Sequence, residues 1–183
     1  MLYALLPVAL LIIVPLAEQL RRARPFMLFA LVAAVYVVLA GLTVAIFRTP
    51  ALLDWVTQPV TSDRTYHDTY YVVSHANFTL SLALIFAVIA LITWGQTKAH
   101  ALYYTRLTTF AFWGLHLSIL GTAIAPVVLQ TNMPRRYADY QEVFDGLNRI
   151  TSLLSFAAFL FLCMLAVLLL LSIVRRISKR SHD

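Results

Sequence analysis

The stretch Thr65–Leu82, which reads TYHDTYYVVSHANFTLSL, holds the residues of this chain best suited to chemistry. His67 and Asp68 stand just ahead of an apolar run, and a second histidine, His75, lies within that run. Apolar bilayer segments rarely carry such groups, because an ionisable side chain is costly to place in hydrocarbon. These three residues therefore require a functional explanation.

The elements that must position these residues are membrane helices. Of the 183 residues, 61% are hydrophobic and 12% are charged, and the mean hydropathy is +0.82, values typical of an integral membrane protein. Backbone groups in lipid must be satisfied within each span, and long runs rich in Leu, Ala and Val achieve this as helices. We predict an all-α integral membrane protein that forms a single membrane domain over residues 1–183. Five transmembrane helices are expected, at roughly 20 residues per crossing, over residues 1–17, 26–47, 70–94, 101–128 and 150–174.

The distribution of Lys and Arg predicts the orientation of these helices. Basic residues are more numerous in the segments after the first, third and fifth spans than in the two other connections. This places the N-terminus outside and the C-terminus in the cytoplasm, as in a bacterial inner membrane. The net charge of +6 is then a topology and lipid-headgroup signal, with no nucleic-acid footprint. The single cysteine, Cys163, can form no intrachain disulfide.

Two polar connections, 48–69 and 129–149, are expected on the outer face of the membrane. The first contains Asp63 as well as His67 and Asp68, and a connection of this length is usually functional or bound to a partner. The second contains the adjacent arginines Arg135 and Arg136. Both connections therefore bring their charged side chains to one side of the bilayer.

The run that begins at His67 resembles a motif of one family, the catalytic subunit I of haem-copper respiratory oxidases such as cytochrome c oxidase. That motif reads His-Asp-Thr-Tyr-Tyr-Val-Val-x-His-x-His, and Asn77 stands here in place of its last histidine. The run Met133–Tyr140 resembles a second motif of the family, Met-Pro-Arg-Arg-Tyr-x-Asp-Tyr. The matches occur in the family's order across most of 24–172, which implies the last five helices of subunit I without the first seven.

The resemblance implies a partly retained haem site. Residues i and i+2 of a helix point about 200° apart, and the family uses this spacing to ligate two haems from one helix. His75 matches the ligand of the oxygen-reducing haem, whereas Asn77 lacks the imidazole that would bind the electron-transfer haem. Arg135 and Arg136 match arginines that contact haem propionates. The alternative is an inherited buried histidine that donates to a carbonyl or to a neighbouring serine, with arginines held by carboxylates or phospholipid headgroups.

The resemblance also implies contacts with partner subunits. His67 and Asp68 match a family pair near a magnesium ion at the contact with the copper-bearing subunit II, although a histidine and an aspartate in a loop can also form a simple hydrogen-bonded pair. The copper histidines of the family belong to its first seven helices, so we expect no copper centre, no catalytic residue, and no oxygen reduction by this chain alone. A cytochrome subunit is another expected partner.

A further histidine, His116, is predicted deep in the fourth span, where the family commonly has asparagine. Its depth differs from that of His75 by ~10 Å at the rise of an α-helix, which disfavours one haem shared between them. Three functions remain open: a subunit-I-like component that binds one haem or completes a pocket with a partner, a haem-free structural subunit that docks a redox partner, and an unrelated transporter. The transporter is the weakest, because the chain has no repeat symmetry and almost no intramembrane charge. We favour the first function, and a Soret band on the purified chain would separate it from the second.

Overall fold

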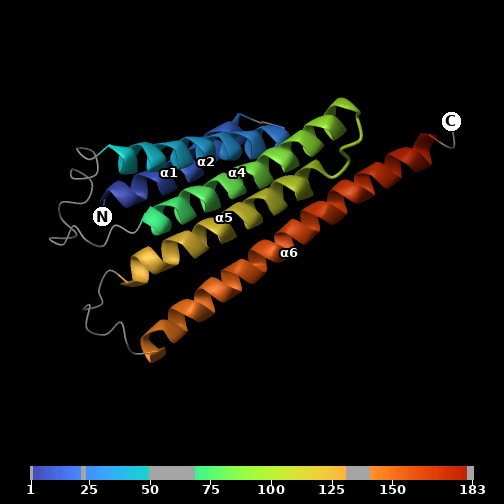
Figure 1. The fold of residues 1–183 in the computed structure, drawn as a ribbon. Helices are drawn as coiled ribbons and strands as arrows, with labels where there is room; N and C mark the ends of the chain where they lie inside the picture. Colours follow the sequence, from blue (N-terminus) through green and yellow to red (C-terminus); the bar gives the residue numbers. More distant parts are fainter. Residues whose placement is uncertain (1, 22–23, 50–68, 131–140, 181–183) are drawn as a thin grey trace. The chain divides into compact units, whose positions relative to one another are not determined.

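The computed structural model describes residues 2–21, 24–49, 69–130 and 141–180, with most side chains described over 7–45, 77–125 and 146–179. All the elements are helices, and no strand occurs in these ranges (Figure 1). The predicted all-α fold with five helices is confirmed. The helices are α1 (Leu2–Leu20), α2 (Pro25–Arg48), α4 (Thr69–Lys98), α5 (Thr105–Gln130) and α6 (Gln141–Arg180).

Four of these helices contain segments long and apolar enough to cross a membrane. The segments are Pro25–Ala45, Asn77–Lys98, Thr105–Ala125 and Gly146–Lys179, and α1 adds a shorter apolar stretch, Pro7–Leu20. The chain is therefore an integral membrane protein.

The chain divides into two compact units, an N-terminal unit (Met1–Trp94) and a C-terminal unit (Gly95–Asp183). In the N-terminal unit α1 packs on α2, and α2 meets α4 through aromatic rings. The Phe86 ring of α4 is fully buried, with its centroid 6.1 Å from that of Phe29 and 5.8 Å from that of Tyr36. Phe29 and Tyr36 lie two turns apart on α2 and so share one of its faces. A single ring therefore fills the space against two turns of the neighbouring helix.

In the C-terminal unit α5 and α6 form a hairpin in which the two helices lie side by side (Figure 1). Two glycines of α5, Gly114 and Gly121, face Phe161 and Leu154 of α6. A Cβ atom added at Gly114 would overlap the Phe161 ring, and one added at Gly121 would lie 2.9 Å from Leu154 Cδ1. Small residues allow transmembrane helices to approach closely, so these glycines determine the spacing of the hairpin.

The helix bounds differ from the predicted spans mainly at α5 and α6. The fourth span is predicted from residue 101, but α5 begins at Thr105, because α4 ends in a turn that includes Ala101. The last span is predicted over 150–174, but α6 runs from Gln141 to Arg180 and contains 40 residues. This helix occupies part of the expected 129–149 connection. Hydropathy follows apolar content, whereas a helix continues through polar residues as long as its backbone hydrogen bonds continue.

Candidate functional site

The predicted cofactor site begins on α4. His75 lies in the second turn of this helix, which starts at Thr69, so the imidazole belongs to a helical backbone at one end of the segment. The side chain of His75 lies outside the described residues, as do His67, Asp68, Arg135 and Arg136 in full. Their predicted roles in binding haem and metal therefore stay predictions.

Asn77 is the first residue of α4 whose side chain is described. The side chain is exposed, and the backbone carbonyl oxygen of Asn77 accepts a hydrogen bond of 2.8 Å from Ser81 Oγ. An amide is a poor ligand for iron compared with a neutral imidazole. Positions i and i+2 of a helix lie on opposite faces, so residues 75 and 77 occupy different faces of α4. Asn77 itself offers no imidazole to an iron atom.

His116 lies in a buried aromatic setting within α5. Its exposed fraction is 0%, and its ring stacks on Phe112, with centroids 5.6 Å apart and an interplanar angle of 18°. The Trp113 ring lies 6.2 Å away at 58°. Phe112 and His116 are one turn apart on the same helix face, so the stack is local to α5. The imidazole therefore contributes to packing in the C-terminal unit.

The described residues bring together no group of three or more His, Cys, Asp or Glu side chains that could hold a metal ion. Cys163 is exposed on α6. A haem needs only one protein ligand on one side of its iron, so an isolated histidine can still serve such a group.

The C-terminal unit contains a cluster of contacts that the sequence did not predict, located where α4 ends, α5 begins and α6 ends. Gln96 Nε2 of α4 donates a 3.0 Å hydrogen bond to the Leu169 carbonyl oxygen of α6. The Arg175 guanidinium carbon lies 4.9 Å from the centroid of the Tyr103 ring, and Lys179 Nζ lies 5.5 Å from the same centroid. The one available signal in the sequence is that tyrosines open one span and basic residues close the next.

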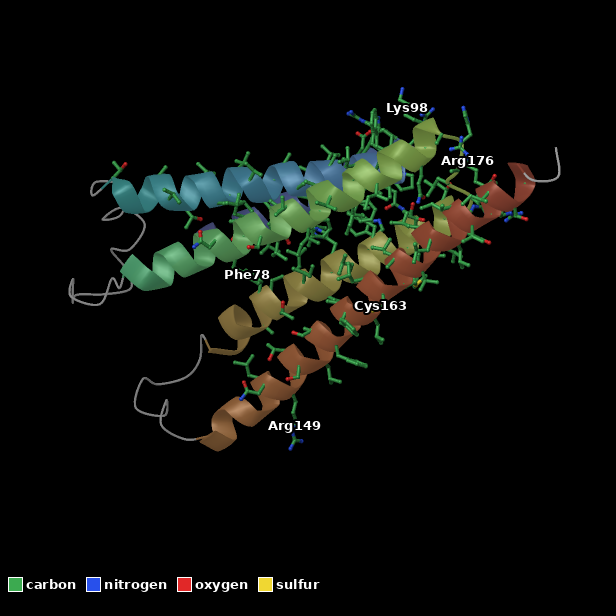
Figure 2. The ribbon with its side chains drawn as sticks, turned by 45° about the vertical axis from the view of Figure 1, so that its right-hand side comes forward. Phe78, Lys98, Arg149, Cys163 and Arg176 are labelled. Carbon is green, nitrogen blue, oxygen red and sulfur yellow. The ribbon has the colours of Figure 1, made fainter. Side chains whose placement is uncertain are left out.

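At the other end of α6 there is an open concavity of about 650 Å³ lined by Asn148, Arg149, Ser152, Leu153 and Phe156. Figure 2 shows Arg149 and Arg176 at opposite ends of this helix. The concavity combines one cation, an amide and a hydroxyl with apolar side chains.

Comparison with known proteins decides the family. The family model described as "Cytochrome C and Quinol oxidase polypeptide I" matches residues 2–160. This chain belongs to that family. The resemblance to subunit I of the haem-copper oxidases, which the two sequence motifs predicted, is thereby confirmed.

Curated relatives in this oxidase family carry the name "Cytochrome c oxidase subunit 1". The protein from Cereibacter sphaeroides is 39% identical over 104 residues, which cover 54% of this chain and 18% of that protein. The protein from Candida albicans is 32% identical over 136 residues, which cover 73% of this chain and 24% of that protein. The chain thus matches between about a fifth and a quarter of the length of these relatives. No solved structure matches.

Proposed function

We propose that this chain is a subunit-I-like membrane subunit of a haem-copper oxidase-type respiratory complex, in which it contributes to a haem pocket or to electron transfer together with partner subunits. The observation that carries the proposal is the family match over residues 2–160, which includes the histidine motif at the start of α4. The chain does not reduce oxygen alone in this proposal, because the copper ligands of the family have no counterpart in its sequence.

His75 would hold the haem, and Arg135 and Arg136 would bind its propionates. A neutral imidazole on a membrane helix is a suitable axial ligand, and a guanidinium can bind a carboxylate through two parallel hydrogen bonds. Bound haem would supply an iron that accepts and releases one electron. The donor set fits a single ligand from α4, since Asn77 replaces the last histidine of the motif.

The partners would be membrane subunits of the same complex, including a copper-bearing subunit of the subunit II kind or a cytochrome subunit. His67 and Asp68 would lie at that contact and take part in a magnesium site completed by the partner. Hard oxygen ligands suit Mg²⁺, which usually takes only one or two carboxylates from each protein site.

Asn77 favours a second candidate function, a haem-free accessory subunit that docks a redox partner. In that function the outer connections keep their charges for protein contacts, and His75 is a packed helical residue. The two functions differ in one measurable property, which is haem content.

The test is the absorption spectrum of the purified chain and of two histidine variants. The haem function predicts a Soret band that His75→Ala abolishes or strongly shifts and that His116→Ala leaves in place. Circular dichroism of each variant establishes that the helices remain folded, which matters because His116 is fully buried. Absence of haem from the unmodified protein, purified with its partners, would leave the accessory function.

Native mass spectrometry after mild-detergent purification tests the partners separately. We expect a complex that contains at least one further membrane protein. A monodisperse monomer that keeps its activity would contradict both candidate functions.

A further inference from the structure

One end of the C-terminal unit collects cations, and the described residues at that end include no carboxylate side chain. The segments 95–130 and 146–179 contain no Asp or Glu. Lys98 at the end of α4 and Arg176 near the end of α6 both lie at this end of the unit (Figure 2). The basic residues here, which we call the inner-end cluster, are Lys98, Arg106, Arg175, Arg176 and Lys179.

Two cations of the inner-end cluster converge on one aromatic ring. Arg175 and Lys179 are one turn apart on α6 and share a face, and the charged groups of both lie within 5.5 Å of the Tyr103 ring centroid. Arg175 also lies 5.9 Å from the Tyr104 ring. Like charges at this spacing repel each other, and the attraction of each cation to the ring offsets that repulsion only in part. A bound anion would therefore relieve the remaining repulsion between Arg175 and Lys179.

The ring that holds the two cations is carried by a well-defined turn. The N–H of Ala101 donates to the Gln96 carbonyl at 2.8 Å, and the N–H of His100 donates to the Thr97 carbonyl at 3.1 Å, which is the bonding pattern of a Schellman motif. His100 takes the left-handed conformation that the motif requires, with φ of 51°. Gln96 also binds the Leu169 carbonyl, so the same turn is tied directly to α6. The turn that precedes Tyr103 is thus hydrogen-bonded to α6, the helix that carries Arg175.

The level of this cluster in the membrane identifies the anion. One apolar segment ends at Lys98 and the next begins at Thr105, so the turn between them lies at a membrane surface. Tyrosine and basic side chains concentrate at that level, where the phosphates of lipid headgroups lie. A guanidinium binds phosphate through paired hydrogen bonds, and an ammonium adds a second charge.

We propose that the inner-end cluster is a binding site for the phosphate of an anionic phospholipid, held by Arg175 and Lys179 beside the Tyr103 ring. The site is independent of haem and lies on residues that the oxidase function described above does not use.

The experiment measures lipid binding by native mass spectrometry of the full chain in detergent, titrated with phosphatidylglycerol and, separately, with phosphatidylcholine. We expect the chain to retain the anionic lipid preferentially. Each basic residue near a membrane surface changes affinity by about fivefold, so R175Q/K179Q should weaken phosphatidylglycerol binding by roughly 25-fold. The matched control is Arg149→Gln, which removes a cation from the opposite end of α6 and should leave the affinity within about twofold. Equal loss in the control, or no loss in the double variant, would overturn the proposal.

Two further arms identify the ligand and the role of the ring. Tyr103→Phe keeps the ring and should retain binding, whereas Tyr103→Leu should weaken it by about fivefold, the amount expected for a lost cation–π contact.

Inorganic phosphate should compete poorly with the lipid, because a lipid adds its acyl chains to the bound area. Competition by millimolar phosphate that removes the lipid completely would assign the site to free phosphate and overturn the lipid assignment. Circular dichroism spectra that match the unmodified protein establish that each variant is folded.

Discussion

The α2–α4 interface of the N-terminal unit and the α5–α6 interface of the C-terminal unit solve the same packing problem in opposite ways. In the first, the large Phe86 ring fills the space against Phe29 and Tyr36. In the second, Gly114 and Gly121 remove side-chain volume so that Phe161 and Leu154 can lie against the backbone of α5.

The difference shows how helices associate where the solvent is itself apolar. Lipid tails are about as apolar as leucine, so association depends on close van der Waals packing rather than on removal of apolar surface from water. An interface of this kind fails when a gap opens and also when an atom is added. The aromatic interface should therefore be sensitive to a loss of side-chain volume and the glycine interface to a gain.

The largest expected effect is at the aromatic interface. Phe86→Ala removes a fully buried ring and should lower the free energy of unfolding by about 3–5 kcal/mol. The measurement is loss of helicity by circular dichroism as SDS is titrated into mixed micelles. Phe78→Ala is the matched control on the same helix, since its ring is 59% exposed, and it should change stability far less. Equal effects would show that the ring contacts do not hold α2 against α4.

The next effect is at the glycine interface. Gly114→Ala adds one methyl group against the Phe161 ring, whose atoms must move to admit it, and should cost about 1–3 kcal/mol in the same titration. Pairing the change with Phe161→Leu supplies a double-mutant cycle, and the overlap predicts a favourable coupling of about 0.5–3 kcal/mol. Strict additivity of the two single changes would argue against a contact at this position.

A smaller effect is expected at Gly121, two turns after Gly114 on the same face of α5. Gly121→Ala brings its new Cβ to 2.9 Å from a terminal methyl group of Leu154. That methyl group can rotate away, so the cost should be about 1 kcal/mol or less. A loss greater than that of Gly114→Ala would reverse the assigned order of closeness along the hairpin.

The smallest effect has the opposite sign and sharpens the contrast between the units. Gly41 lies in α2, and no atom of the described residues lies within 4 Å of a Cβ added there. Gly41→Ala should therefore stabilise the protein by about 0.5–1 kcal/mol, because alanine loses less backbone entropy in a helix. Destabilisation on the same SDS scale would indicate that this glycine also has a close neighbour.

The sequence was sufficient to predict the number and type of the helices, because long apolar runs in a membrane have few alternatives to a helix. It did not predict where α6 begins, since Gln141 and the residues after it are too polar to register as a span although they continue the helix. Nor did it predict the end of α4. A histidine in the left-handed conformation closes that helix at a position more often occupied by glycine.

The candidate site was predictable only as a motif. His75 could be assigned to a membrane helix because its neighbours are apolar, and the structure places it in α4. The contacts within the C-terminal unit were not predictable, because nothing in the sequence relates Gly114 to Phe161 or Tyr103 to Arg175. Such pairs depend on the relative register of two helices, and packing sets this register.

The helix α6 is longer than a bilayer is thick. Its 40 residues extend about 60 Å at 1.5 Å each, whereas a bilayer with its headgroups is about 40–45 Å thick. The segment of α6 that is apolar enough to cross a membrane begins at Gly146, so the helix starts about one turn before it, at Gln141. If α6 stands upright with Arg175 and Tyr103 at one membrane surface, this first turn extends beyond the hydrocarbon on the other side. A molecule that approaches the bilayer from that side would then meet helical backbone at the start of α6.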